Sequence, residues 1–245
     1  MRKIHALGAL LMLTAWSGNL ESANTFTAAR FRIGSTAQAE VRWTPNPDRG
    51  SASSSMSGGR RGAPFAVCAL DHSQPDPAIT LLVPDGDLHI TTEAQPTLSW
   101  FLESDSVVSM EFMLSSPAQP DPIYTKQIQA ETGLVEVSLP ASAELEPGVA
   151  YRWTVFVECD GGDYAIHASS RVERTDDADI VAVAAMPLSE RADAYAAKGV
   201  WYDALNTLVS AYRQEGEMTT LLDIRDLLKQ ADAEVPLELS LATES

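Results

Sequence analysis

Residues 145–157 read Leu-Glu-Pro-Gly-Val-Ala-Tyr-Arg-Trp-Thr-Val-Phe-Val. The Pro147-Gly148 pair marks a turn, and the side chains that follow it alternate strictly between two faces. One face carries Tyr151, Trp153, Val155 and Val157, whereas Arg152 and Thr154 lie on the other. Alternation of this length, with aromatic residues on the apolar face, is typical of a central strand in a two-sheet sandwich.

Turn signals divide the chain around this strand into short apolar runs. We predict eight strands, at 79–83, 88–91, 96–102, 107–114, 123–128, 134–139, 150–159 and 164–172. Strands of this length and spacing indicate a mainly β fold with added α structure, an immunoglobulin-like or fibronectin-like antiparallel β-sandwich. We place the sandwich at 65–175 and expect Trp100 and Trp153 in its core.

After Thr175 the apolar period lengthens, which predicts a helical subdomain at 187–231. Pro187 marks the start of a first helix and Gly199 its end, a second helix begins at Trp201, and a third covers 221–231. Tyr195, Ala204 and Leu208 are expected between the first two helices. This pair resembles one tetratricopeptide unit, but a stable solenoid needs about three repeats. We therefore predict a hairpin that packs against the sandwich or a neighbouring helix.

The amino terminus has the composition of a secretory signal. Arg2 and Lys3 precede an apolar run at 6–16 that is too short to span a bilayer as a helix. Cleavage after Ala23 gives a signal peptide at 1–23, whereas Ala37–Ala39 is a better match and places cleavage as late as 39. We expect an extracytoplasmic protein, periplasmic or secreted, without a transmembrane segment.

The segments that flank the predicted domains are polar. We predict a flexible Ser- and Gly-rich spacer at 24–64 and an acidic flexible tail at 232–245. The formal net charge of −17 argues against nucleic acid as a partner, because binding to phosphates needs clustered Lys and Arg.

Cys68 and Cys159 are the two cysteines of the chain. A lone pair in an oxidising compartment predicts one disulfide. The pair has no neighbouring histidines, so we do not predict a metal site formed by these two residues.

The sequence gives little support to catalysis or to a metal or cofactor site. His72, His89 and His167 lie in separate segments without the spacing of zinc ligands. The acidic segments Asp85–Asp87 and Asp160–Asp163 are candidates for calcium, but hairpin turns explain both. We find no nucleophile or phosphate-binding motif, and we predict a protein that is not an enzyme and has no cofactor.

Several short motifs follow one another along the chain. They are Arg60–Pro64 before Cys68, Leu81–Pro84, Thr91-Thr92, Pro96-Thr97, Glu111-Phe112, Ile123-Tyr124, Val137–Pro140, Pro147-Gly148 with Tyr151 and Trp153, Cys159-Asp160, and Tyr195–Leu205. Together they resemble the domain of unknown function 928 family, exported proteins found mainly in cyanobacteria. The resemblance covers about 60–228, with a shortened basic and glycine-rich segment before Cys68. The family supplies no catalytic residues to transfer.

The sequence is compatible with three functional hypotheses. The leading hypothesis is a non-enzymatic module that binds another envelope or secreted protein, with Trp201 or Tyr202 as its candidate partner surface. The alternative is a module that binds cell-surface polysaccharide through exposed aromatic residues. The weakest hypothesis is an exported hydrolase.

Overall fold

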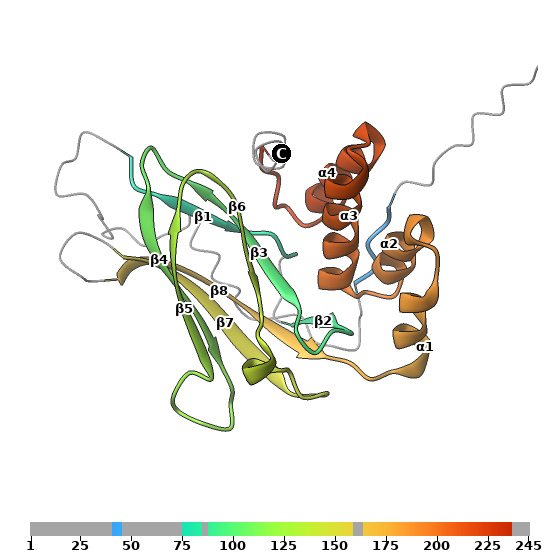
Figure 1. Ribbon diagram of the computed structural model, residues 1–245, viewed down its shortest axis with the longest axis horizontal. Helices are drawn as coiled ribbons and strands as arrows, with labels where there is room; N and C mark the ends of the chain where they lie inside the picture. Colours follow the sequence, from blue (N-terminus) through green and yellow to red (C-terminus); the bar gives the residue numbers. More distant parts are fainter. Residues whose placement is uncertain (1–40, 46–74, 85–87, 159–163, 237–245) are drawn as a thin grey trace, which may run out of the picture. The chain divides into compact units, whose positions relative to one another are not determined.

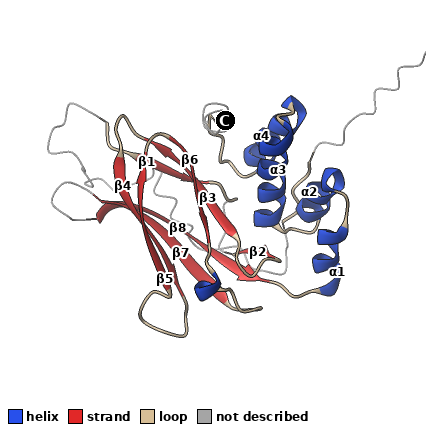
Figure 2. Ribbon diagram, in the orientation of Figure 1, coloured by secondary structure: helices blue, strands red, loops and turns tan. Residues whose placement is uncertain are grey.

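The computed structural model describes residues 41–45, 75–84, 88–158 and 164–236, all within the compact unit Ala39–Ser245 (Figure 1). In the described residues the strands β1–β8 precede the helices α1–α4 along the chain, and Figure 2 shows strands and helices in separate colours.

All eight predicted strands are present. They are β1 (Ala78–Leu81), β2 (His89–Thr91), β3 (Thr97–Glu103), β4 (Val108–Ser115), β5 (Tyr124–Ala130), β6 (Gly133–Ser138), β7 (Ala150–Glu158) and β8 (Tyr164–Arg174). The strand that contains Trp153 is β7, a central strand of the larger sheet as predicted, between β8 and β4. The alternation of side chains therefore located the strands correctly, to within about two residues at each end.

The strands form two sheets of unequal size. The smaller sheet has the order β1-β3-β6, and the larger has the order β2-β8-β7-β4-β5. All pairs are antiparallel except β2 with β8, which is parallel. The expectation of a purely antiparallel sandwich is corrected here. Because β1 and β2 belong to different sheets, they do not pair with each other as the two strands of a hairpin, contrary to our expectation.

Three aromatic side chains lie in the core between the two sheets. Trp100 of β3, Phe112 of β4 and Trp153 of β7 are each 0% exposed. The ring centroids of Trp100 lie 6.2 Å from Phe112 and 6.4 Å from Trp153. The predicted core position of both tryptophans is therefore confirmed.

Four α-helices follow β8 along the chain. They are α1 (Ala178–Val181), α2 (Leu188–Ala197), α3 (Trp201–Glu215) and α4 (Met218–Gln230). The three predicted helices correspond to α2, α3 and α4, and Gly199 at φ 75° separates the first two as expected. The short α1, whose first turn is capped by the Asp177 carboxylate, was not predicted. Tyr195, Ala204 and Leu208 are all buried.

A short segment before the sandwich, residues Val41–Pro45, is bound to the helices; we call it the strap. It is drawn in blue beside α2 in Figure 1. Val41 is 2% exposed, and the Thr44 amide donates to the carbonyl oxygen of Ala196 at 3.1 Å. The prediction of a flexible spacer throughout 24–64 is therefore wrong for these residues, because Val41 and Trp43 bring apolar side chains that the polar segment after them lacks.

The predicted flexible tail also begins too early. Ala231 and Ala233 are buried and Val235 packs against the core, whereas Asp232, Glu234 and Pro236 are exposed. Asp232, just after the C-cap of α4, has a φ of 52° in the left-handed region, and residues 233–236 continue beyond this turn with Ala233 buried.

Candidate functional site

The most conspicuous polar and aromatic groups lie where α3 meets the sandwich, and we call this contact the joint. Trp201 is the first residue of α3 and is 0% exposed. Its indole Nε1 donates to the carbonyl oxygen of Leu82, just after β1, at 2.7 Å. The Trp201 ring also packs against the ring of Trp43 in the strap. The two rings are in a T-shaped arrangement, with centroids 5.0 Å apart. Trp201 therefore links the helix to the smaller sheet and to the strap.

Tyr202 points about 100° away from Trp201 around the helix and reaches the larger sheet. Its hydroxyl accepts a hydrogen bond from Trp153 Nε1 at 2.9 Å and donates to the carbonyl oxygen of Arg171 at 3.4 Å. The side chain is 2% exposed, and burial raises the pKa of the Tyr202 hydroxyl. The hydroxyl therefore supplies a partner for the indole N–H at the centre of the core.

These positions correct the expectation for Trp201 and Tyr202 as a partner surface. The hypothesis required one of the two side chains to be exposed, and both are buried. Adjacent helix residues can both be covered when their helix has packing partners on two sides, as α3 has in α2 and α4 and in β2 and β3. In this conformation neither side chain is available to a partner.

Asp203 is the third member of the joint and was not predicted. It is 5% exposed, and its carboxylate accepts from the Thr92 amide at 3.1 and 3.2 Å and from the Thr92 hydroxyl. Burial raises the pKa of the Asp203 carboxyl, the bonds from Thr91 and Thr92 oppose that rise, and the charge of Glu93 adds to it. The carboxylate thus fastens α3 to the residues that follow β2.

Two further contacts extend the joint along α3. Asn206 Nδ2 donates to the carbonyl oxygen of Thr97 at 2.9 Å, and Arg213 forms an ion pair with Glu136 of β6. Tyr202, Asn206 and Arg213 recur at i, i+4 and i+11, so they lie on one face of the helix. A polar residue at Asp203, inside an otherwise apolar and aromatic run, is the sequence signal from which this contact could have been inferred.

The polar contacts of the joint attach α3 to the sandwich. The Asp203 carboxylate is occupied by Thr92, and both aromatic polar atoms have partners in the sandwich. Among the described residues no group of three or more His, Cys, Asp or Glu is placed to hold a metal ion. Of the histidines, His89 is buried with Nε2 3.0 Å from the Pro84 carbonyl oxygen, and His167 is exposed on β8.

Several predicted features lie outside the described residues. They are Cys68, Cys159, His72, and the acidic segments 85–87 and 160–163. The disulfide between the two cysteines therefore stays a prediction.

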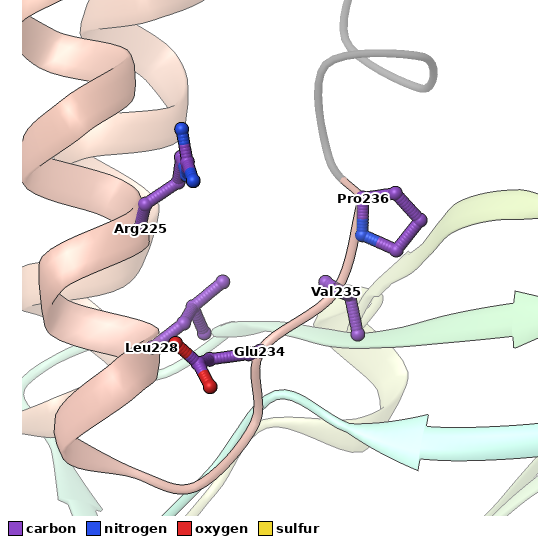
Figure 3. A pocket seen from close by; sticks show the side chains of 5 residues that line it. All are labelled: Arg225, Leu228, Glu234, Val235 and Pro236. Carbon is purple, nitrogen blue, oxygen red and sulfur yellow. The ribbon is translucent and has the colours of Figure 1, made fainter.

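A small cavity lies between α4 and residues 234–236 (Figure 3). Its volume is about 240 Å³, and it is lined by Arg225, Leu228, Glu234, Val235 and Pro236. Pockets for small organic ligands are usually about 300–1,000 Å³. This cavity therefore carries no ligand assignment.

In the part of the chain that the structure describes, none of the helices has the length and apolar character that crossing a bilayer requires.

Comparisons with known proteins give a family without a named activity. No curated protein matches the chain. Among solved structures, astrotactin-2, described as a conserved vertebrate-specific and perforin-like membrane protein involved in neuronal development, shares 12% identity with it. That match covers 66% of this chain and 38% of the other at a TM-score of 0.24, which carries no argument about fold or function. The family model described as Domain of Unknown Function (DUF928) matches residues 56–243, so the chain belongs to that family.

Proposed function

We propose that this protein is an exported, non-enzymatic module that binds another envelope or secreted protein. One observation carries the proposal: the helices hold an extended peptide segment, the strap, by its main chain. The Trp43 amide donates to Gln230 Oε1, and Gln230 Nε2 donates to the Val41 carbonyl oxygen, both at 2.8 Å. Hydrogen bonds to the main chain, with pockets for alternate side chains, are a recurrent mode of peptide recognition.

We also propose that the sandwich is of the immunoglobulin or fibronectin class. The order β1-β3-β6 opposite β8-β7-β4-β5 supports this, because it corresponds to strands A-B-E opposite G-F-C-C′ in the lettering of that class. The Tyr151 hydroxyl, near the start of β7, accepts from the Glu146 amide at 3.2 Å. This bond has the form of the tyrosine corner of that class.

In the same way we propose that α2 and α3 form one tetratricopeptide-like hairpin. The contact between α2 and α3 and the burial of Ala192, Tyr195 and Ala204 support it. Both folds serve many functions, so the functional proposal depends on the strap and not on the fold class.

The polysaccharide alternative needs exposed aromatic side chains. Every Phe, Trp and Tyr side chain whose burial the structure describes is buried or half-buried, and the large apolar side chains exposed there are Val107, Val181, Met218 and Leu222. No observation favours that alternative or the hydrolase, and we propose neither.

Site-directed photo-cross-linking in the native envelope tests the proposal. A photoreactive residue replaces Lys198 or Lys229, exposed positions beside the ends of α2 and α4, and the control replaces Val107 at the far turn of the sandwich. We expect the same identified protein from both helix positions and less of it from Val107. Binding of that protein is then reproduced with purified components. Cross-linking that is equal at all three positions, or purified protein that binds cell-wall polysaccharide and no protein, would overturn the proposal.

A further inference from the structure

The strap occupies a seat formed by the ends of two helices and the start of a third, and we call this seat the cradle. Its residues are Ala196 at the end of α2, Trp201 at the start of α3 and Gln230 at the end of α4. The Gln230 carboxamide accepts from the Trp43 amide and donates to the Val41 carbonyl oxygen. Its Nε2 also donates to the Asp226 carbonyl oxygen at 3.0 Å, which fixes the carboxamide against α4. The cradle therefore recognises the main chain with an oriented side chain.

Side chains of the strap alternate between the cradle and solvent. Val41 is buried and Trp43 is half-buried against the Trp201 ring, whereas Arg42 and Thr44 are exposed. This is the geometry of an extended peptide whose alternate side chains enter pockets. In the strap, the side chains that enter the cradle are a branched aliphatic residue and, two positions later, a tryptophan.

The strap gains little free energy from this seat. One buried aliphatic side chain, one half-buried tryptophan and three hydrogen bonds compete with the entropy lost when five residues are ordered. We expect gains and cost of similar size, and therefore a segment that opens and closes. Closure is favoured because the strap and β1 are parts of one chain, separated in sequence by residues 46–74.

We propose that the cradle is the docking site for an extended segment of the partner protein, and that the strap is its built-in competitor. The inference rests on the proposed function and adds the chemistry of the partner. The partner segment presents the aliphatic-x-tryptophan pattern, and it binds by replacing the strap.

The first test measures binding of a fluorescent peptide that spans residues 39–46 to the full chain. In the Trp43→Ala chain the competitor is weakened and the cradle is intact, so the peptide should bind at least about 10-fold more tightly than to the parent chain. The matched control is Arg42→Ala, which alters an exposed strap residue and should leave the affinity at the parent value. Equal affinity for the Trp43→Ala and parent chains would overturn the inference.

Two controls separate specific docking from charge effects, because the chain has a net charge of −17 and the peptide contains the charged residues Glu40 and Arg42. A scrambled peptide of the same composition should bind at least about 10-fold more weakly. The double variant Trp43→Ala/Gln230→Ala should lose the gained affinity, because the carboxamide that reads the main chain is absent. Equal binding of the scrambled peptide would refute specific docking.

A second measurement applies if Trp43→Ala prevents folding. A protease site inserted between Gly58 and Gly59 of the full chain is cut after purification, and release of the amino-terminal piece is followed by gel filtration. We expect release on dilution and faster release with excess peptide. A piece that stays bound under both conditions would show a permanent structural segment and contradict the role of competitor. Cross-linking of a partner that the peptide does not displace would reject the cradle and leave the proposed function standing.

Discussion

Tyr202→Phe is the sharpest test of the joint, because it removes one oxygen atom and keeps the ring. The hydroxyl accepts from Trp153 Nε1 at 2.9 Å, and the two side chains are 2% and 0% exposed. The variant leaves the indole N–H buried without its acceptor, which costs about 1–3 kcal/mol. The bond to the Arg171 carbonyl oxygen is long, at 3.4 Å, and contributes less. We therefore expect the free energy of unfolding to fall by about 1–3 kcal/mol.

Urea unfolding, followed by far-ultraviolet circular dichroism and by tryptophan fluorescence, measures this change. The matched control is Tyr212→Phe, also on α3 but half-buried, which should change the free energy of unfolding by less than about 0.5 kcal/mol. The two signals should share one transition in the parent protein, because the joint couples helices and sandwich into one unit.

A double-mutant cycle with Trp153→Phe isolates the interaction. Removal of either partner should make removal of the other less costly, with a coupling energy of about 0.5–3 kcal/mol. If Tyr202→Phe matches the parent within about 0.5 kcal/mol and the coupling is zero, the hydrogen bond does not fasten α3 to the sandwich, and the reasoning is refuted.

Three further predictions address the core, the buried carboxylate and the cysteines. Trp100→Ala and Trp153→Ala should each lower the free energy of unfolding by about 3–5 kcal/mol, as large core truncations do, and a thermal melt within a degree of the parent would contradict this. Because the pKa of the Asp203 carboxyl is raised from 3.8, its contribution to stability is fully present below pH 3.8 and is lost as the pH rises through the raised value. Unfolding in urea across that range should therefore show parent stability falling relative to Asp203→Asn, and a constant or rising difference would disprove it. Mass spectrometry of unreduced peptides should find Cys68 bonded to Cys159 in the exported protein. Two free thiols would contradict this prediction.

The strands and helices were predictable because their signals are local. Alternation around Trp153 gives a strand with one buried face, and the spacing of Ala204, Leu205 and Leu208 gives a helix with one buried stripe. Pairing of strands is not local. The sequence near Pro84 has the composition of a hairpin turn. It contains no local signal that β2 joins the other sheet and pairs in parallel with β8.

The joint and the strap were missed for the same physical reason. Asp203 meets Thr92 across 111 positions, and Gln230 meets Trp43 across 187. Trp201 and Tyr202 have apolar rings and polar atoms, a combination that suits an interface inside the protein as well as one with a partner. For the strap a weak signal exists, since Val41 and Trp43 alternate with polar residues just before a Ser- and Gly-rich segment.

The contact between the strap and α4 also sets the order in which the fold is completed. The chain is synthesised from its amino end, so Val41 exists 189 positions before Gln230, the residue whose carboxamide receives it. The strands β1–β8 end at Arg174, so all of them are synthesised before the helices that seat the strap. Seating the strap is therefore among the last steps, and it occurs after the final helix is made. A chain that stops short of α4 therefore lacks two of the three hydrogen bonds described for the main chain of the strap, and its amino-terminal segment is held only by α2 and the start of α3.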